Sequence, residues 1–130
     1  MLHDLLLRYL EEVESSLQRF ENAYVERYQE EIVTPSRANL RIRVRFPTGS
    51  LLELNEAVVV EMEMLMHLSY RYHFQDRENR LLLRYDNTPH FPDLESFPYH
   101  KHLENKVESC EKPSIAQVVE EIKLHLGCRL

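Results

Sequence analysis

The segment Asn39–Phe46, which reads NLRIRVRF, decides the fold because its side chains alternate between apolar and basic after Asn39. Leu40, Ile42, Val44 and Phe46 fall on one side of an extended chain, and the intervening arginines fall on the other. A strand with one apolar and one charged face is typical of an antiparallel sheet that covers a core on one side and meets solvent on the other. The segment therefore predicts a domain in which other elements pack against the apolar face.

Three further segments continue the sheet pattern downstream. The residues PTGS turn the chain into a second strand, LLELNEAVVVE, which begins at Leu51, and a reversal within Glu61–Met64 leads to a third strand over Leu65–Gln75. The apolar face of this third strand is formed by Met66, Leu68, Tyr70, Tyr72 and Phe74. The residues DREN then turn the chain into RLLLRYD, which begins at Arg80. Short turns between sequential strands predict a four-stranded antiparallel meander over residues 39–87.

Helical spacing precedes and follows the predicted sheet. Apolar residues recur every three or four positions from Leu2 to Ile32 without an interrupting glycine or proline, so residues 1–33 are expected to form one long amphipathic helix. Residues 114–127 are expected to form a second helix, because Ser114 and Gln117 have the spacing of a capping box at its start. These two helices are the elements available to cover the apolar face of the sheet.

Residues 88–112, between the sheet and the second helix, contain prolines and histidines. The prolines of NTPHFPDLESFPYHKH disfavour both helix and ladder bonding, while its aromatic residues supply apolar surface for packing against the domain. The sequence thus predicts a single α+β domain over residues 1–130. Its expected parts are a long N-terminal helix, a four-stranded antiparallel meander, a packed proline-rich segment and a C-terminal helix.

Composition excludes several classes of function. The net charge of −6 argues against a general basic coating for nucleic acid, although residues 34–90 contain eight arginines against seven acids and could present a local cationic patch. No apolar run approaches the roughly 20 residues that cross a bilayer, and no signal-peptide cleavage pattern follows the N-terminus, so no membrane association and a cytoplasmic location are expected. The chain has only two glycines, which excludes glycine-rich loops that bind nucleotide phosphates.

Six arginines share the polar face of the predicted sheet if the strands pair in phase. They are Arg41, Arg43, Arg45, Arg71, Arg80 and Arg84. A guanidinium group binds phosphate or carboxylate with paired hydrogen bonds, so this face could hold an RNA backbone. The alternative is a solvated face with cross-strand ion pairs to Glu53 and Glu61, each contributing less than about 1 kcal/mol.

Four of the seven histidines fall within a short part of the chain, and they are His73, His90, His100 and His102. Imidazole exchanges a proton near neutral pH, and a lysine or arginine stabilises the charge that develops on a reacting phosphate. His73 and one of His100 or His102 are therefore the candidate acid and base of a metal-independent ribonuclease, with Asp86 orienting an imidazole. The candidate phosphate contacts are Arg71, Arg84 and Lys101, and His90 is an additional candidate.

The same residues could instead bind a metal ion. His100 and His102, together with Asp86 and with His90 or His73, include ligand types that zinc and manganese accept. An HxH pattern alone is weakly specific, and no cysteine or dense group of carboxylates completes it. We therefore expect neither a metal nor another cofactor, and a metal-dependent hydrolase or nuclease is the alternative.

The strings YRYHFQD, NRLLLRYDNTPHFPDLESFPYHKHL and PSIAQVVEEI, in that order, resemble the TumE-type family of toxins from bacterial and archaeal toxin–antitoxin loci. The resemblance covers roughly Thr48 to Ile122. It implies a small cytoplasmic toxin that a cognate antitoxin neutralises, and such antitoxins are often helix-turn-helix DNA-binding proteins. The motif residues that carry over are Arg71, His73, Arg84, Asp86, His90, His100, Lys101 and His102.

The residues and the resemblance together favour the toxin of a toxin–antitoxin pair that acts as a metal-independent endoribonuclease. RNA is the expected substrate and the antitoxin the expected partner. A homodimer along the N-terminal helix is a further expectation, because a helix of that length would be longer than a small domain needs. Besides the metal-dependent alternative, a non-catalytic module that binds other proteins through its arginine face and acidic helix stays open.

Overall fold

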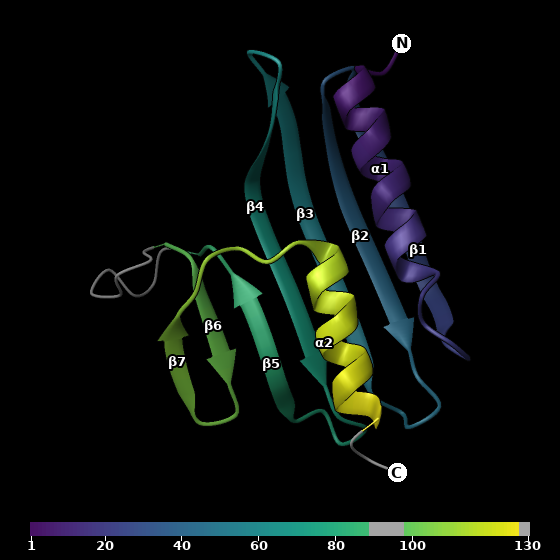
Figure 1. Cartoon of the computed structure of the whole chain (residues 1–130), viewed down its shortest axis with the longest axis vertical. Helices are drawn as coiled ribbons and strands as arrows, with labels where there is room; N and C mark the ends of the chain where they lie inside the picture. The colour runs from purple at the N-terminus through teal and green to yellow at the C-terminus, as the bar shows by residue number, and fades with distance from the viewer. Residues whose placement is uncertain (89–97, 128–130) are drawn as a thin grey trace.

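The structure is a computed structural model, and it describes residues 1–88 and 98–127. Within these residues the sheet has seven strands, each of which pairs antiparallel with the next one along the chain (Figure 1). The elements are α1 (Asp4–Leu17), β1 (Tyr24–Thr34), β2 (Arg37–Arg45), β3 (Leu51–Glu61), β4 (Met64–Gln75), β5 (Leu81–Asp86), β6 (His100–Leu103), β7 (Lys106–Ser109) and α2 (Ile115–Gly127). The predicted α+β class and the antiparallel meander are confirmed, and the predicted count of four strands is wrong.

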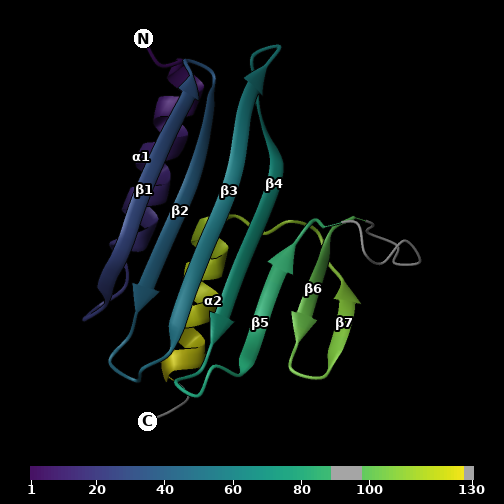
Figure 2. The same ribbon diagram turned by 180° about the vertical axis from the view of Figure 1, so that it is seen from behind.

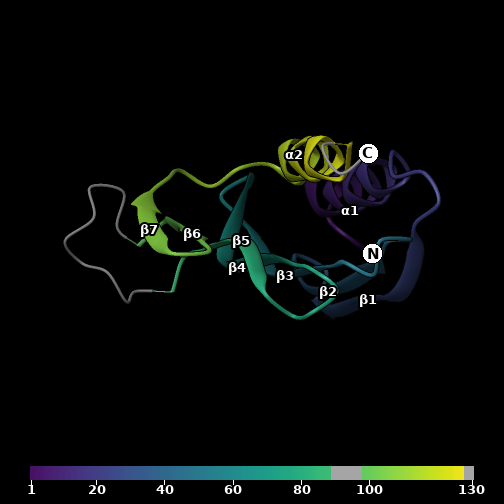
Figure 3. The same ribbon diagram turned by 90° about the horizontal axis from the view of Figure 1, so that it is seen from below.

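Both helices pack on the same face of the sheet (Figure 3). α1 lies over β1 and β2, and α2 lies over β3 and β4 (Figure 1). The core between the layers includes Leu6, Leu10 and Val13 of α1, Val118, Val119 and Ile122 of α2, and Leu40, Ile42, Leu52, Leu54, Tyr72 and Phe74 of the sheet. The opposite face, which we call the open face, is left uncovered by the two helices (Figure 2).

The predicted long N-terminal helix is wrong beyond Leu17. α1 ends there, Asn22 adopts a left-handed φ of 58°, and β1 begins at Tyr24. The apolar spacing behind the prediction is four residues in this region, at positions 20, 24, 28 and 32. Four residues are close to one helical turn and are also two full strand repeats, so the spacing fits both structures. α1 has only 14 residues and packs on the sheet. The long helix over residues 1–33, through which a homodimer was expected to form, is therefore not present.

The predicted reversal between β3 and β4 is confirmed. It is a two-residue connection made by Met62 and Glu63, whose φ angles of 51° and 59° both lie in the left-handed region. Two successive residues in this conformation match the twist of an antiparallel hairpin, which is why such turns usually contain asparagine, aspartate or glycine. Here neither residue is of that kind, so the connection carries backbone strain.

A β-bulge in β4 changes which side chains face the helices. Ala57 pairs with Ser69, but the next residue of β3, Val58, pairs with His67, so Leu68 is an extra residue. The prediction that Met66 and Leu68 share the apolar face with Tyr70 is therefore wrong, and they are 46% and 47% exposed. His67 instead contacts Tyr9 of α1 on the helix side.

Residues 88–112 contribute two strands that were not predicted. β6 and β7 form a hairpin at the far edge of the sheet from β1, and β6 pairs with β5. The prolines that argued against strands lie outside the segment from 99 to 112. Residues 89–97, which include the candidate His90, lie outside the described residues.

The predicted C-terminal helix is confirmed. The backbone N–H of Gln117 donates to Ser114 Oγ at 3.0 Å, and the backbone N–H of Ser114 donates to Gln117 Oε1 at 2.8 Å, which is a complete capping box.

No helix in the described part of the chain has the length and apolar content that crossing a bilayer requires.

Candidate functional site

Strand register gathers six of the predicted site residues into two adjacent rows on the open face. Residues directly opposite each other in antiparallel strands point to the same face of a sheet. The first row runs across β4, β5 and β6 and consists of His73, Arg84 and His102. The second row lies beside it and consists of Arg71, Asp86 and His100. Residues distant in sequence are thus brought together by pairing alone.

Asp86 lies between the two histidines of β6. Its Oδ1 is 2.7 Å from Nε2 of His100, and its Oδ2 is 3.6 Å from Nε2 of His102. The two rings meet edge to face with their centroids 4.8 Å apart. Asp86 is 4% exposed and His100 1%, whereas the side chain of His102 is 21% exposed. His102 is therefore the ring of this cluster that solvent reaches best.

His73 is held as a neutral ring. Nε of Arg84 donates to His73 Nδ1 at 3.1 Å, so Nδ1 carries a lone pair, and His73 Nε2 donates to Gln75 Oε1 at 2.9 Å. Burial lowers the pKa of His73, and the positive charges of Arg84 and Arg71 lower it further. The hydrogen bond to Gln75 and the negative charge of Glu53 raise the pKa but do not outweigh these effects. A neutral imidazole with its lone pair directed at Arg84 follows from these contacts.

Lys101 does not join the two rows. It lies between His100 and His102 in β6, so its side chain points to the helix side of the sheet. There its Nζ pairs with Glu121 Oε2 at 2.8 Å and lies 4.9 Å from the centroid of the Tyr85 ring. Burial lowers the pKa of Lys101, but the bonds to Glu121 and Tyr85 outweigh it, and the pKa is raised above its usual range. This lysine attaches β6 to α2.

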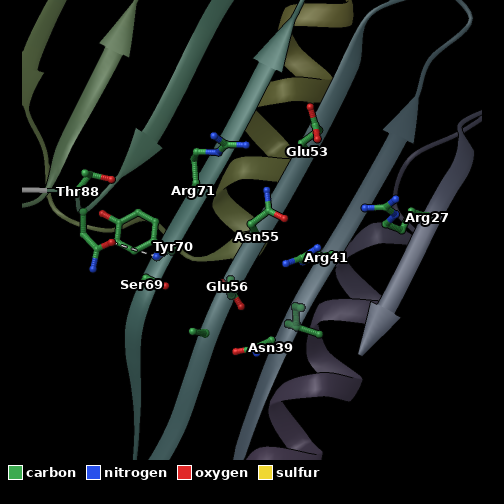
Figure 4. Close-up of a pocket in the computed structure, with 13 residues that line it drawn as sticks. Arg27, Asn39, Arg41, Glu53, Asn55, Glu56, Ser69, Tyr70, Arg71 and Thr88 are labelled. Atoms are coloured by element: carbon green, nitrogen blue, oxygen red, sulfur yellow. Dashed lines mark hydrogen bonds between the residues drawn. The ribbon is translucent and has the colours of Figure 1, made fainter. Parts of the chain in front are cut away.

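A groove of about 520 Å³ crosses the open face next to the two rows. Figure 4 shows Arg27 of β1, Arg41 of β2 and Arg71 of β4 along it, with Asn55 between Arg41 and Arg71. All three arginines are exposed, and none makes an ion pair with a residue that the structure describes. We call them the groove arginines. The groove includes Arg71, which belongs to the second row, and continues to Asn87 and Thr88 after β5.

Arg43 and Arg45 of the open face are paired with acidic neighbours. The alternative interpretation of this face expected such pairs with Glu53 and Glu61, and the structure shows pairs with Glu26 and Glu53. Nε of Arg43 and Nε of Arg45 lie 2.8 Å and 3.1 Å from the two carboxylate oxygens of Glu26. Arg43 also lies 3.7 Å from Glu53. Arg43 and Arg45 are thus paired with carboxylates, whereas the groove arginines on the same face are not paired with a carboxylate of the described residues.

Sequence reasoning missed Arg27, because the segment that contains it was predicted to be helical. The signal that could have found it is the alternation of ERYQEE, which places Arg27, Gln29 and Glu31 on one face of a strand. The structure confirms that face, since Glu31 Oε1 accepts a hydrogen bond from Asn39 at 2.7 Å and Arg27 is opposite Arg43.

A second polar cluster lies on the helix side of the sheet and was also missed. The buried carboxylate of Glu56 accepts hydrogen bonds from the hydroxyls of Tyr9 and Tyr72 and lies 3.2 Å from Nε2 of His67. Burial raises the pKa of Glu56, but the contacts with His67, Tyr72 and Tyr9 outweigh it, so the pKa is lowered below its usual value. The cluster fastens α1 to β3 and β4.

These features define a small α+β protein whose open sheet face combines imidazoles, a buried carboxylate and unpaired guanidinium groups. A family model described as Toxin TumE matches residues 9–125, and the chain belongs to this toxin family. The match confirms the resemblance and extends it to the second part of α1 and to β1 and β2. Membership of a toxin family implies an antitoxin partner. Comparisons with curated proteins and with solved structures found no match.

Proposed function

We propose that this toxin is an endoribonuclease that cleaves RNA by acid–base catalysis without a metal ion. The observation that carries the proposal is the first row, in which Arg84 lies between His73 and His102. Neighbouring strands are about 4.8 Å apart, so the backbones of the two histidines are about 10 Å apart on either side of the guanidinium group. A phosphate bound at Arg84 would have one imidazole on each side.

The reaction needs a base, an acid and a cation at the phosphate. His73 removes the proton of a ribose 2′-hydroxyl, and the oxygen attacks the adjacent phosphorus. Arg84 and Arg71 neutralise the charge that develops on the phosphate oxygens. His102 donates a proton to the departing 5′-oxygen. The products are a 2′,3′-cyclic phosphate and a 5′-hydroxyl, and the base and acid exchange protonation states.

The contacts of the first row suit these roles. His73 is neutral, as a base must be, and its Nδ1 lone pair becomes available when Arg84 turns from it to a phosphate. Asp86 forms an ion pair with His102 when that ring is protonated, which is the state of the acid before the reaction. Lys101 has no part in the mechanism, because it is bound to Glu121 on the other face.

The groove arginines supply binding for the RNA backbone on one side of the two rows. In the cell we propose that the toxin acts on cytoplasmic RNA and that its cognate antitoxin, a DNA-binding protein, neutralises it. An antitoxin segment with acidic side chains would compete with RNA for the groove, because carboxylates and phosphates bind guanidinium groups in the same way.

The test is incubation of the purified protein with bulk single-stranded RNA in the presence of EDTA. We expect cleavage by the wild type and a loss of about 10²-fold or more in rate for both His73→Gln and His102→Gln, because each removes one proton-transfer step. Arg8→Gln, which changes an exposed arginine of α1, is the matched control and should retain the wild-type rate.

Mapping of the product ends checks the chemistry, since a 2′,3′-cyclic phosphate requires attack by the 2′-oxygen. Equal rates for the two histidine variants and the control would count against the roles of His73 and His102, and absence of cleavage by the wild type would count against catalysis. In that case the open face would serve as a non-catalytic interaction module.

A further inference from the structure

The ring of His100 has its tautomer fixed by a backbone carbonyl. Its Nδ1 lies 2.9 Å from the carbonyl oxygen of Pro98. A carbonyl oxygen only accepts, so Nδ1 must carry the hydrogen and donate it. In the neutral ring the lone pair therefore belongs to Nε2, which is the atom 2.7 Å from Asp86 Oδ1. Two electron-rich acceptor atoms this close require a positive charge between or beside them.

A separation of 2.7 Å is that of a hydrogen bond to a charged group, so a proton joins the pair in this structure, and the third group nearby completes the set of ligands that a metal ion in place of that proton would need. One ring nitrogen of His102, one ring nitrogen of His100 and a carboxylate oxygen of Asp86 all lie within 4.8 Å of one another. Zinc binds nitrogen and oxygen at about 2.0–2.2 Å, so ligand atoms around a tetrahedral ion are about 3.4 Å apart. The separation of 3.6 Å between Asp86 and His102 is close to this value, and the 2.7 Å between Asp86 and His100 would have to widen by about 0.7 Å when an ion replaces the proton. We infer that Asp86, His100 and His102 form a binding site for Zn²⁺ or a similar divalent transition metal ion.

The surroundings of the three ligands support this inference. A histidine that binds a metal usually donates its other ring N–H to a carbonyl or carboxylate, which is the role of Pro98 for His100. The ladder between β5 and β6 places Asp86 opposite His100, and His102 follows on the same face. Two histidines and one carboxylate are a recurrent donor set for divalent transition metals, and three protein ligands leave positions open for water or substrate.

The nearest cation of the first row does not compete for the site. Nε of Arg84 is bound to His73 of β4, on the side of β5 away from His100 and His102. Its positive charge is therefore directed toward β4, and Asp86 supplies the negative charge that a divalent ion needs. Burial of Asp86 and His100 strengthens the attraction between the ion and its ligands.

Occupation of the site would inhibit the toxin, and this consequence rests on the proposed function. A metal ion bound to Nε2 of His102 occupies the lone pair of that nitrogen. In the proposed reaction the same nitrogen holds the proton that is donated to the departing 5′-oxygen. The ring can then no longer act as the acid. Binding of the metal itself does not depend on whether the protein cleaves RNA, so the two ideas can fail separately.

Calorimetric titration of the full-length, chelator-treated protein with ZnCl₂ tests the site. We expect saturable binding with one ion per chain, and binding that is at least about tenfold weaker in His102→Gln and in Asp86→Asn. His73→Gln is the matched control, because it removes a histidine of the same face that is not a ligand, and it should bind Zn²⁺ as the wild type does.

Because Asp86 is buried, each variant is first compared with the wild type by circular dichroism and thermal melting. If Asp86→Asn does not fold, the more exposed His102→Gln and the absorption spectrum of Co²⁺ bound to the wild type decide the matter, since a Co²⁺ ion held by nitrogen and oxygen ligands is coloured. Absence of saturable binding by the wild type, or equal binding by His102→Gln and the wild type, overturns the site.

RNA cleavage with and without saturating Zn²⁺ tests the inhibition. Loss of cleavage in the wild type that EDTA reverses supports it. Retained cleavage, or cleavage only when Zn²⁺ is bound, overturns the inhibition while the titration still reports on the site. Absence of cleavage under all conditions, with Zn²⁺ bound, overturns the proposed ribonuclease function and leaves the metal site supported.

Discussion

At the scale of single residues, Glu56 is a carboxylate inside the core. It is 4% exposed and sits among the apolar side chains that α1 and the sheet bury. Tyr9, Tyr72 and His67 surround it and supply its hydrogen bonds and ion pair. Because a buried charge is costly without partners, the three side chains and Glu56 stabilise the protein only as a group.

Glu56→Gln is expected to destabilise the protein by about 2–3 kcal/mol, because an amide replaces a charged acceptor and brings an N–H₂ group against hydroxyls that donate. Urea unfolding at neutral pH measures the difference. Glu53→Gln, a change on the open face of the same strand, is the control and should cost less than about 1 kcal/mol.

The same carboxylate predicts a dependence of stability on pH. The pKa of Glu56 is lower in the folded protein than its ordinary value of 4.5, so the charged form stabilises the fold above that value. This contribution is lost as the pH falls through the folded-state pKa. The difference in stability between wild type and Glu56→Gln should therefore shrink in acid, and a constant difference from neutral pH to strong acid would contradict the assignment.

At the scale of elements, the hairpin between β3 and β4 is strained at its tip. Replacing Met62 and Glu63 by Asn and Gly is expected to stabilise the protein by about 1 kcal/mol, because asparagine and glycine adopt left-handed φ angles at lower cost. The midpoint of thermal unfolding should rise by about 3–5 °C. Met62→Ala removes the same exposed side chain but keeps the strain, so it should give no such rise.

The elements differ in how far the sequence could predict them. β2 to β5 and α2 were predictable because the alternation of β2, β4 and β5, the turn residues PTGS and DREN, and the capping box each point to one structure. β1 was not, since a repeat of four residues fits a helix and a strand equally. β6 and β7 have four residues each, too few to establish a period, and the bulge at Leu68 reverses a face without any mark in the local sequence.

For the candidate site, the sequence indicated which residues to consider but not how their side chains lie relative to one another. The residue types and the alternation of β4 and β5 indicated His73, Arg84 and Asp86 as site residues. Their catalytic roles remain predictions. Their arrangement depends on the register between β5 and β6, which is a long-range pairing that no local pattern specifies. Without β6 as a strand, Lys101 could not be assigned to the opposite face from its two neighbours.

At the scale of the whole molecule, one face of the sheet forms the core and the other carries the candidate site. The helices cover one face of the sheet and form the core with it (Figures 2 and 3). The other face carries the groove and the two rows. A chain with a net charge of −6 can therefore still present unpaired positive charge in one place. The acidic residues that outnumber the bases do not pair with the groove arginines in the described structure.

This separation predicts how RNA binding depends on salt. In a His102→Gln background, in which we expect cleavage to be at least about 10²-fold slower, Arg41→Gln should weaken binding of a labelled single-stranded RNA. It should also lower the slope of log affinity against log salt by about 0.7, the value for one phosphate contact on a single strand. Fluorescence anisotropy at several salt concentrations measures both. Arg80→Gln, whose guanidinium is already paired with Asp76 and Glu78, should change neither, and equal effects of the two substitutions would contradict RNA binding in the groove.

The alternation of β6 has a consequence for how the protein tolerates insertions and deletions. His100 and His102 face one way and Lys101 faces the other, so the chemistry of this strand depends on whether a position is odd or even. Removal of one residue just before β6 would place an ammonium group beside Asp86 and turn both imidazoles toward Glu121. Removal of two would restore the orientation and shift the histidines along the strand by one pair, which makes paired changes more tolerable than single ones.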